Sequence, residues 1–236
     1  TEHIEDEKRV ATEEDAVKLG RAHGETRVGN GHASASHVLW ISTVVFLVSS
    51  VTIQLALNAV RAGDLRGLTR FLNGFLTPMT DVLLAHGATI DKYMGDAIMA
   101  FWNAPKEVAD HPDRAMRTAV IMQRRMTALN ERWSATDPNH VPLSVRIGVH
   151  TGEVVVGNVG GEDRFDYSAI GDAVNLAARL EPANKTYDTL NMVSSVTLEA
   201  ASGEYRVREL DLIAVKGKEA PVLVYELLEL GGVELD

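Results

Sequence analysis

The chain has 236 residues, of which 45% are hydrophobic and 24% charged, proportions typical of a soluble globular protein that can bury one core of ordinary size. Its 33 acidic and 23 basic residues leave a net charge of −10, which argues against a protein that binds nucleic acid through a broad basic surface. There is no cysteine, so disulfides, thiolate metal sites and cysteine nucleophiles are excluded.

The first 60 residues divide into two parts of different composition. Residues 1–36 combine many charged side chains with an end rich in Gly, Asn and Ser, which predicts a flexible leader or linker. Residues 38–60 carry no charged side chain, and ~20 apolar residues can cross a bilayer as a helix. Two interpretations stay open: a membrane segment, or a buried strand followed by a packed helix. The β-branched and aromatic run Val44-Val45-Phe46-Leu47-Val48 favours the strand.

The next part of the chain predicts a helix, a hairpin and a second helix. Apolar residues recur at threes and fours over 67–84, as in an amphipathic helix, and Pro78 predicts a kink or a break inside it. Short apolar runs at 88–90 and 97–102 flank a turn that carries Gly95-Asp96 and so predict a β-hairpin. His111-Pro112-Asp113 then begins another helix, because proline is favoured in a first turn.

The remaining segments predict further strands and one more helix. Residues 142–150 alternate apolar and polar side chains, and 153–159 follow as a separate strand. We expect a helix from residue 173 to 180, and strands over 192–196 and 223–228. This order predicts an α+β fold with a ferredoxin-like βαββαβ core, helices on one face, and an additional C-terminal helix and strands.

Three segments carry a resemblance to a known family. They are residues 91–102 (DKYMGDAIMAFW), 165–179 (FDYSAIGDAVNLAAR) and 215–218 (VKGK). Together they resemble the catalytic domain of the class III adenylate and guanylate cyclases, in the form found in bacterial adenylate cyclases. The resemblance implies the class III cyclase fold, with a catalytic domain over 37–230 and a tail over 231–236. It also implies conversion of ATP to 3′,5′-cyclic AMP and pyrophosphate in intracellular signalling.

Asp96 is the candidate metal ligand, and Lys92 and Ser168 are the candidates for reading the base. A carboxylate on a turn can ligate Mg²⁺ or Mn²⁺ together with substrate phosphates, although a turn aspartate can also stabilise its own backbone. The resemblance implies the metal role for Asp96, a contact of Lys92 with adenine, and completion of adenine reading by Ser168. A lysine donates to adenine N1 but cannot accept from guanine N1–H, which favours ATP over GTP.

Four further residues are candidates for binding ATP and stabilising its reaction. Asn175 and Arg179 are four apart on a predicted helix, so they share a face and could simply be a polar pair exposed to water. The resemblance implies that Asn175 orients the ribose and that Arg179 stabilises charge developing on the phosphate. It also implies that Lys216 contacts the terminal phosphates and that Arg146 contacts phosphate.

The resemblance implies a homodimer with composite sites at its interface. One chain would supply Asp96 and Arg146 to a site, and its partner would supply the other residues. These are Lys92, Ser168, Asn175, Arg179 and Lys216. No nucleic-acid partner is expected. The expected location is the cytoplasm, including the cytoplasmic part of a membrane-attached protein anchored through upstream sequence.

One residue that the family's site uses is missing. The family's first strand ends in an aspartate that supplies another metal ligand. That aspartate would fall at or near Ser50, but no acid occurs between Ala33 and Gly63. Because a hydroxyl is a poor substitute for a carboxylate around Mg²⁺, we expect impaired adenylate cyclase activity. Three explanations stay open: a degenerate cyclase, a local sequence error, or a rearranged region in which Asp64 supplies the ligand.

Two other functions compete with the enzyme. One is a catalytically degenerate nucleotide-binding or dimerisation module that acts as the partner of an intact cyclase. The other is a membrane-anchored sensor fragment that uses residues 38–60 as its span. Metal-dependent turnover separates the enzyme from the degenerate module, and solubility of the whole chain without detergent counts against the anchored fragment.

Overall fold

The structure is a computed structural model that describes residues 38–49, 65–161, 164–213 and 221–230. Several predictions fall outside these residues, namely those for the leader over 1–36, for the helix expected after the first strand, and for the tail over 231–236. The same holds for Ser50, Asp64 and Lys216. Among the helices that the structure describes, none is both long and apolar enough to cross a membrane.

A βαββαβ unit forms the first part of the fold and confirms the predicted core. Its elements are β1 (Val38–Ser49), α3 (Leu65–Ala85), β2 (Thr89–Met94), β3 (Ala97–Phe101), α4 (His111–Thr136) and β4 (Val145–Gly161). The apolar run over 44–48 lies inside β1, so the strand interpretation is confirmed for residues 38–49. The predicted hairpin is β2 and β3, which pair antiparallel.

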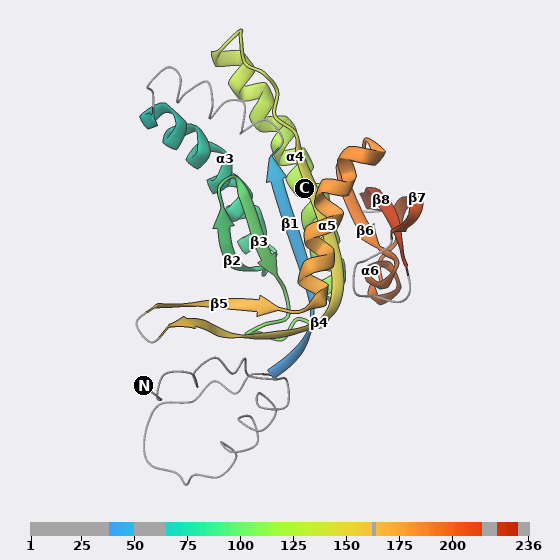
Figure 1. The fold of residues 1–236 in the computed structure, drawn as a ribbon. Coiled ribbons are helices and arrows are strands. Elements are labelled where there is room, and N and C mark those ends of the chain that lie inside the picture. Colours follow the sequence, from blue (N-terminus) through green and yellow to red (C-terminus); the bar gives the residue numbers. More distant parts are fainter. Residues whose placement is uncertain (1–37, 50–64, 162–163, 214–220, 231–236) are drawn as a thin grey trace, which may run out of the picture. The chain divides into compact units, whose positions relative to one another are not determined.

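The C-terminal part adds β5 (Arg164–Ile170), α5 (Asp172–Tyr187), β6 (Asn191–Ser194), α6 (Ser195–Ala200), β7 (Tyr205–Ile213) and β8 (Val222–Leu230). One sheet joins the strands in the order β2-β3-β1-β4-β6-β8-β7, with β5 paired to β4 (Figure 1). β1 is therefore a central strand that pairs antiparallel with both β3 and β4.

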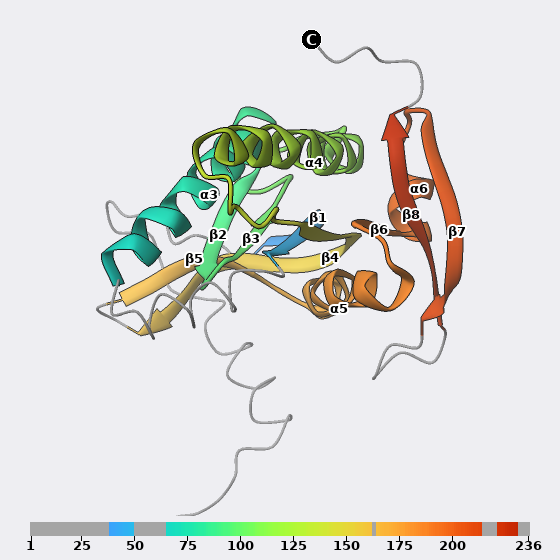
Figure 2. The same ribbon diagram turned by 90° about the horizontal axis from the view of Figure 1, so that it is seen from above.

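Helices cover both faces of the sheet. Seen from above, α3 and α4 lie on one side of β1 to β4 and α5 lies on the other side (Figure 2). The main core, between the sheet and the first two helices, is made of large side chains that include Phe75, Met79, Met116, Met122 and Ile147. Smaller clusters fill the space under α5 and include Val154, Ala173, Leu176 and Leu180. The expectation of helices on one face thus holds for α3 and α4, whereas the additional helix forms a third layer.

Two details differ from the sequence-based expectations. The segments predicted as separate strands, 142–150 and 153–159, belong to the single strand β4, because β1 pairs with it continuously from Ser49↔Val145 to Val38↔Val156. The helix α3 continues through Pro78 without a break. Phe75 and Met79 on either side of the proline are both almost completely buried, so core packing holds the helix together where local propensity alone would interrupt it.

Candidate active site

The β2–β3 turn presents Asp96. Gly95 precedes it with φ of +67°, a left-handed conformation that glycine adopts without steric cost. Within the described part of the chain, Oδ2 of Asp96 is buried and makes no hydrogen bond. A buried carboxylate oxygen without a partner is costly unless a cation or a donor satisfies it, so this atom fits a divalent metal. No group of three or more His, Asp or Glu side chains among the described residues could hold a metal by itself.

The end of β1 lies between the two strands that carry candidate site residues. β1 pairs with β3 from Val44↔Phe101 to Leu47↔Ile98, close to the turn that carries Asp96. On its other side, β1 pairs Val48 with Arg146 of β4. No acidic residue occurs in β1, so this strand offers no second carboxylate to a metal held by Asp96. Ser50, at or near which the resemblance implies that carboxylate, lies outside the described residues.

Arg146 on β4 is paired with a residue that the sequence analysis did not single out. Its Nε donates to Oε1 of Glu181 on α5 at 2.9 Å, and both side chains are largely buried. Burial raises the pKa of Glu181, the pairing with Arg146 opposes this increase, and the negative charge of Asp96 adds to it. The carboxylate of Glu181 thus interacts electrostatically with both Arg146 and Asp96, and the assignment of these two residues to one half-site stays a prediction.

A second group joins the two residues expected to read the base. Oδ2 of Asp91 accepts hydrogen bonds from Oγ of Ser168 at 2.7 Å and from the backbone N–H of Ala169 at 3.0 Å. Nζ of Lys92 lies 3.1 Å from Oδ1 of the same carboxylate. Apart from this ion pair, Oδ1 is buried and has no hydrogen-bond partner among the residues that the structure describes. The structure therefore brings Lys92 and Ser168 together through Asp91, which the sequence analysis did not identify.

Helix α5 carries Asn175 and Arg179 on its exposed side. Its opposite side packs on β4, and Gly148 makes this close approach feasible. A Cβ at Gly148 would lie 2.5 Å from the carbonyl oxygen of Ala177, closer than real Cβ atoms come. The helix is therefore held firmly against the sheet, with Asn175 and Arg179 one turn apart and facing outward. Lys216 lies outside the described residues.

Comparison with known proteins identifies the family. A model of the adenylate and guanylate cyclase catalytic domain matches residues 56–229. The chain belongs to this family. Adenylate cyclase 1 of Rhizobium meliloti is 35% identical over 158 residues, which are 66% of this chain and 23% of that protein. The cyclase domain thus spans about a quarter of that relative's length. β1 precedes the matched residues.

Two solved structures of cyclases share the fold. The adenylyl cyclase CyaB from P. aeruginosa superimposes with a TM-score of 0.73 at 30% identity, covering 82% of this chain and 96% of that one. The guanylyl cyclase Cya2 gives a TM-score of 0.73 at 31% identity, covering 83% of this chain and 95% of that one. Because one structure is an adenylyl cyclase and the other a guanylyl cyclase, this similarity does not distinguish ATP from GTP.

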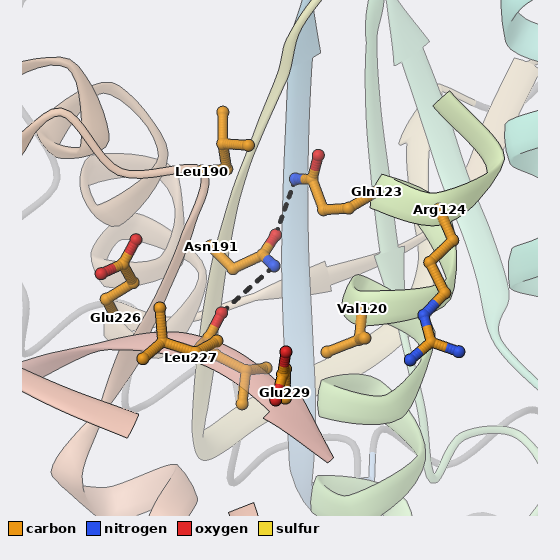
Figure 3. A pocket seen from close by; sticks show the side chains of 9 residues that line it. Val120, Gln123, Arg124, Leu190, Asn191, Glu226, Leu227 and Glu229 are labelled. Atoms are coloured by element: carbon orange, nitrogen blue, oxygen red, sulfur yellow. Dashed lines mark hydrogen bonds between the residues drawn. The ribbon is translucent and has the colours of Figure 1, made fainter. Parts of the chain in front are cut away.

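A separate pocket of about 290 Å³ lies between α4, β6 and β8 of the cyclase domain (Figure 3). Its wall includes Gln123, which donates to Oδ1 of Asn191 at 2.8 Å, while Nδ2 of Asn191 donates to the carbonyl of Leu227. These polar groups satisfy one another across three elements, and the pocket contains none of the residues expected to bind nucleotide. We therefore interpret them as structural connections between α4 and the C-terminal strands.

Proposed function

We propose that this cyclase domain converts ATP to 3′,5′-cyclic AMP and pyrophosphate. The observation that carries the proposal is the grouping of Lys92 and Ser168 around Asp91. An ammonium donor beside a hydroxyl acceptor matches the N1 acceptor and the C6 amino donor of adenine. Guanine presents the opposite pattern at these two positions, an N1–H donor and a C6 oxygen acceptor. The residues thus favour ATP.

In the proposed reaction, the ribose 3′ oxygen attacks the α-phosphorus, the bond to the bridging oxygen of pyrophosphate breaks, and the 3′ hydroxyl loses its proton. Positioning and stabilisation of charge are the protein's main contributions. Asn175 would orient the ribose, and the exposed Arg179 would contact the developing charge. Arg146 would use terminal N–H groups of its guanidinium on phosphate while Nε stays with Glu181. Lys216 would contact the terminal phosphates.

Asp96 is the residue that would hold Mg²⁺ or Mn²⁺, because its Oδ2 is buried and without a hydrogen bond among the described residues. When bound, the cation would neutralise phosphate charge and lower the pKa of the attacking hydroxyl. With Ser50 in place of a second carboxylate, Asp96 would bind the cation weakly, and we infer that turnover is slow for this reason.

A homodimer is part of the proposal, because each site would combine the group of Asp96 and Arg146 from one chain with the group of Lys92 and Ser168 from the other. Val155 and Val159 of β4 and Ile170 of β5 are 42%, 42% and 53% exposed. In the β4–β5 register, Val155 faces Ile170 and Gly157 faces Ser168, so these apolar side chains share one face of the ladder with Ser168. An exposed apolar surface beside the base-reading residues suits a second copy of the chain.

The missing carboxylate supports one alternative function. A domain that keeps Lys92, Ser168, Asn175 and Arg179 but lacks one metal ligand could serve as the partner of an intact cyclase, which would supply the metal half-site. Mixing the chain with an intact cyclase domain that lacks its own base-reading lysine would then restore cyclic AMP formation. Activity of the chain alone would exclude this alternative as its main role.

The experiment that tests the proposed function is product analysis with ATP and GTP as substrates, in Mg²⁺ and in Mn²⁺. We expect cyclic AMP from ATP, little cyclic GMP from GTP, and loss of product in Asp96→Ala. Asp110→Ala is the matched control, since Asp110 is exposed at the start of α4 and pairs only with Arg114 among the ion pairs of the described residues. Formation of cyclic GMP in preference to cyclic AMP would refute the substrate assignment.

A further inference from the structure

An irregularity in β2 lies next to the base-reading residues. β2 and β3 pair Ile90 with Ala100 and Lys92 with Met99, so Asp91 is an extra residue in a β-bulge. Successive side chains of a regular strand point to opposite faces, which would separate Asp91 from Lys92. A bulge bends the strand and redirects a side chain, and bulges are over-represented beside active sites. Here the bulge lets the carboxylate of Asp91 and the ammonium of Lys92 meet.

The carboxylate of Asp91 fixes the direction of the hydrogen bond with Ser168. The Asp91 side chain has no exposed surface, and Ser168 is buried as well, so bulk water does not compete for the bond between them. An ionised carboxylate only accepts hydrogen bonds, so Ser168 must donate its single hydroxyl hydrogen to Asp91. The hydroxyl oxygen of Ser168 then has only lone pairs to offer to a ligand.

We propose that Asp91 is a positioning residue that sets the preference for adenine, an inference that rests on the proposed function. It does so through two neighbours at once. Its Oδ2 commits Ser168 to act as an acceptor, which suits the adenine C6 amino group and opposes the guanine C6 oxygen. Its Oδ1 holds the Lys92 ammonium, which donates to adenine N1. Asp91 itself lies behind these two residues and does not touch the base.

Equilibrium binding of 3′-deoxy nucleotides tests this role without any turnover, since they lack the attacking oxygen. 3′-Deoxy-ATP and 3′-deoxy-ITP differ only at positions 1 and 6 of the purine, where inosine carries N1–H and a C6 oxygen. We expect the unchanged dimer to bind 3′-deoxy-ATP about tenfold more tightly or better, because two hydrogen bonds match only adenine. Calorimetry in the presence of Mg²⁺ measures both affinities.

The decisive variant is Asp91→Asn. An asparagine can keep its carbonyl oxygen toward Ser168 and Ala169, but its NH₂ group then faces the Lys92 ammonium and displaces it. Affinity for 3′-deoxy-ATP should fall about tenfold while affinity for 3′-deoxy-ITP changes little, since inosine cannot use the lysine. Asp110→Asn, the same change at an exposed position, should keep the preference. Should Asp91→Asn not fold, Asp91→Ser removes the charge with a smaller side chain.

Each outcome has a definite meaning. Loss of the adenine preference in Asp91→Asn, with Asp110→Asn unchanged, supports the positioning role. An unchanged preference overturns it and leaves the proposed function intact. An equal loss of affinity for both nucleotides also overturns it, because Asp91 would then only hold the fold. If the unchanged chain binds neither nucleotide, the proposed function fails and this inference fails with it.

Discussion

Ser50→Asp is the change that most directly examines the departure at the end of β1. The resemblance to the cyclase family implies a second metal carboxylate at or near position 50, directly after β1. Two carboxylates placed to share a cation at about 5 Å repel by about 3 kcal/mol at an effective dielectric constant of about 20 when no cation is bound. Arg146, which is paired with Val48 near the end of β1, offsets part of this repulsion.

In a chelating buffer, the free energy of unfolding of Ser50→Asp should therefore be about 2 kcal/mol lower than that of the unchanged chain. A domain of this size loses about 2–4 °C of melting temperature per kcal/mol, so we expect a decrease of about 4–8 °C. Mn²⁺ or Mg²⁺ should reverse the effect, because a cation held by two carboxylates at 100 times its Kd adds about 2.7 kcal/mol. Thermal unfolding with and without metal measures both shifts.

The matched control is Ser134→Asp, the same change at an exposed position near the end of α4. It should alter stability by about 0.5 kcal/mol or less and show no additional response to metal. If Ser50→Asp behaves like Ser134→Asp in both buffers, position 50 does not lie beside Asp96 and the predicted site of the second carboxylate is wrong.

Three further predictions address other parts of the site. Glu181→Ala should lower the free energy of unfolding by about 3 kcal/mol, because it leaves the Arg146 guanidinium largely buried without its partner. Glu181→Gln should cost less, and urea titrations compare the two. Since the pKa of Glu181 is raised in the folded state, this residue's titration stabilises the fold at low pH, and that contribution is lost as pH rises through the folded pKa. In metal-free buffer, the free energy of unfolding of the unchanged chain, relative to that of Glu181→Gln, should therefore decrease as pH rises. Mixing Asp96→Ala with Arg179→Ala, each silent alone, should restore about a quarter of the unchanged activity, because half of the dimers are mixed and each holds one intact site; a silent mixture argues against composite sites. Gly148→Ala should lower stability by about 2 kcal/mol or more in thermal unfolding, since the added Cβ meets the backbone of α5 at 2.5 Å; an unchanged melting temperature would mean that α5 is not held tightly.

Much of the core could be predicted because its signals are local. The β-branched run over 44–48 gave β1, the spacing over 67–84 gave α3, and Pro112 marked the start of α4. The union of two predicted strands into β4 could not be predicted in this way. It depends on the length of β1, a strand about 100 residues away in sequence, which pairs with β4 along its whole length.

The residues of the candidate site also divide into those that local motifs identify and those whose contacts are distant in sequence. Asp96, Lys92, Ser168, Asn175 and Arg179 were named from motifs, and their roles stay predictions. Asp91 and Glu181 were not named, because their importance depends on contacts distant in sequence. Glu181 meets Arg146 across 35 positions and Asp91 meets Ser168 across 77. The β-bulge that redirects Asp91 leaves no sign in the sequence, since neither glycine nor proline marks it.

The decisive measurement is the rate of cyclic AMP formation by Ser50→Asp, relative to the unchanged chain at saturating ATP and Mg²⁺. We propose that this is an adenylate cyclase domain slowed by a missing metal carboxylate. The substitution should therefore raise the rate about tenfold or more, because a second carboxylate completes the cation site, and Asp96→Ala should remove the gain. A folded, Mg²⁺-responsive Ser50→Asp that forms cyclic AMP no faster than the unchanged chain would contradict this proposal.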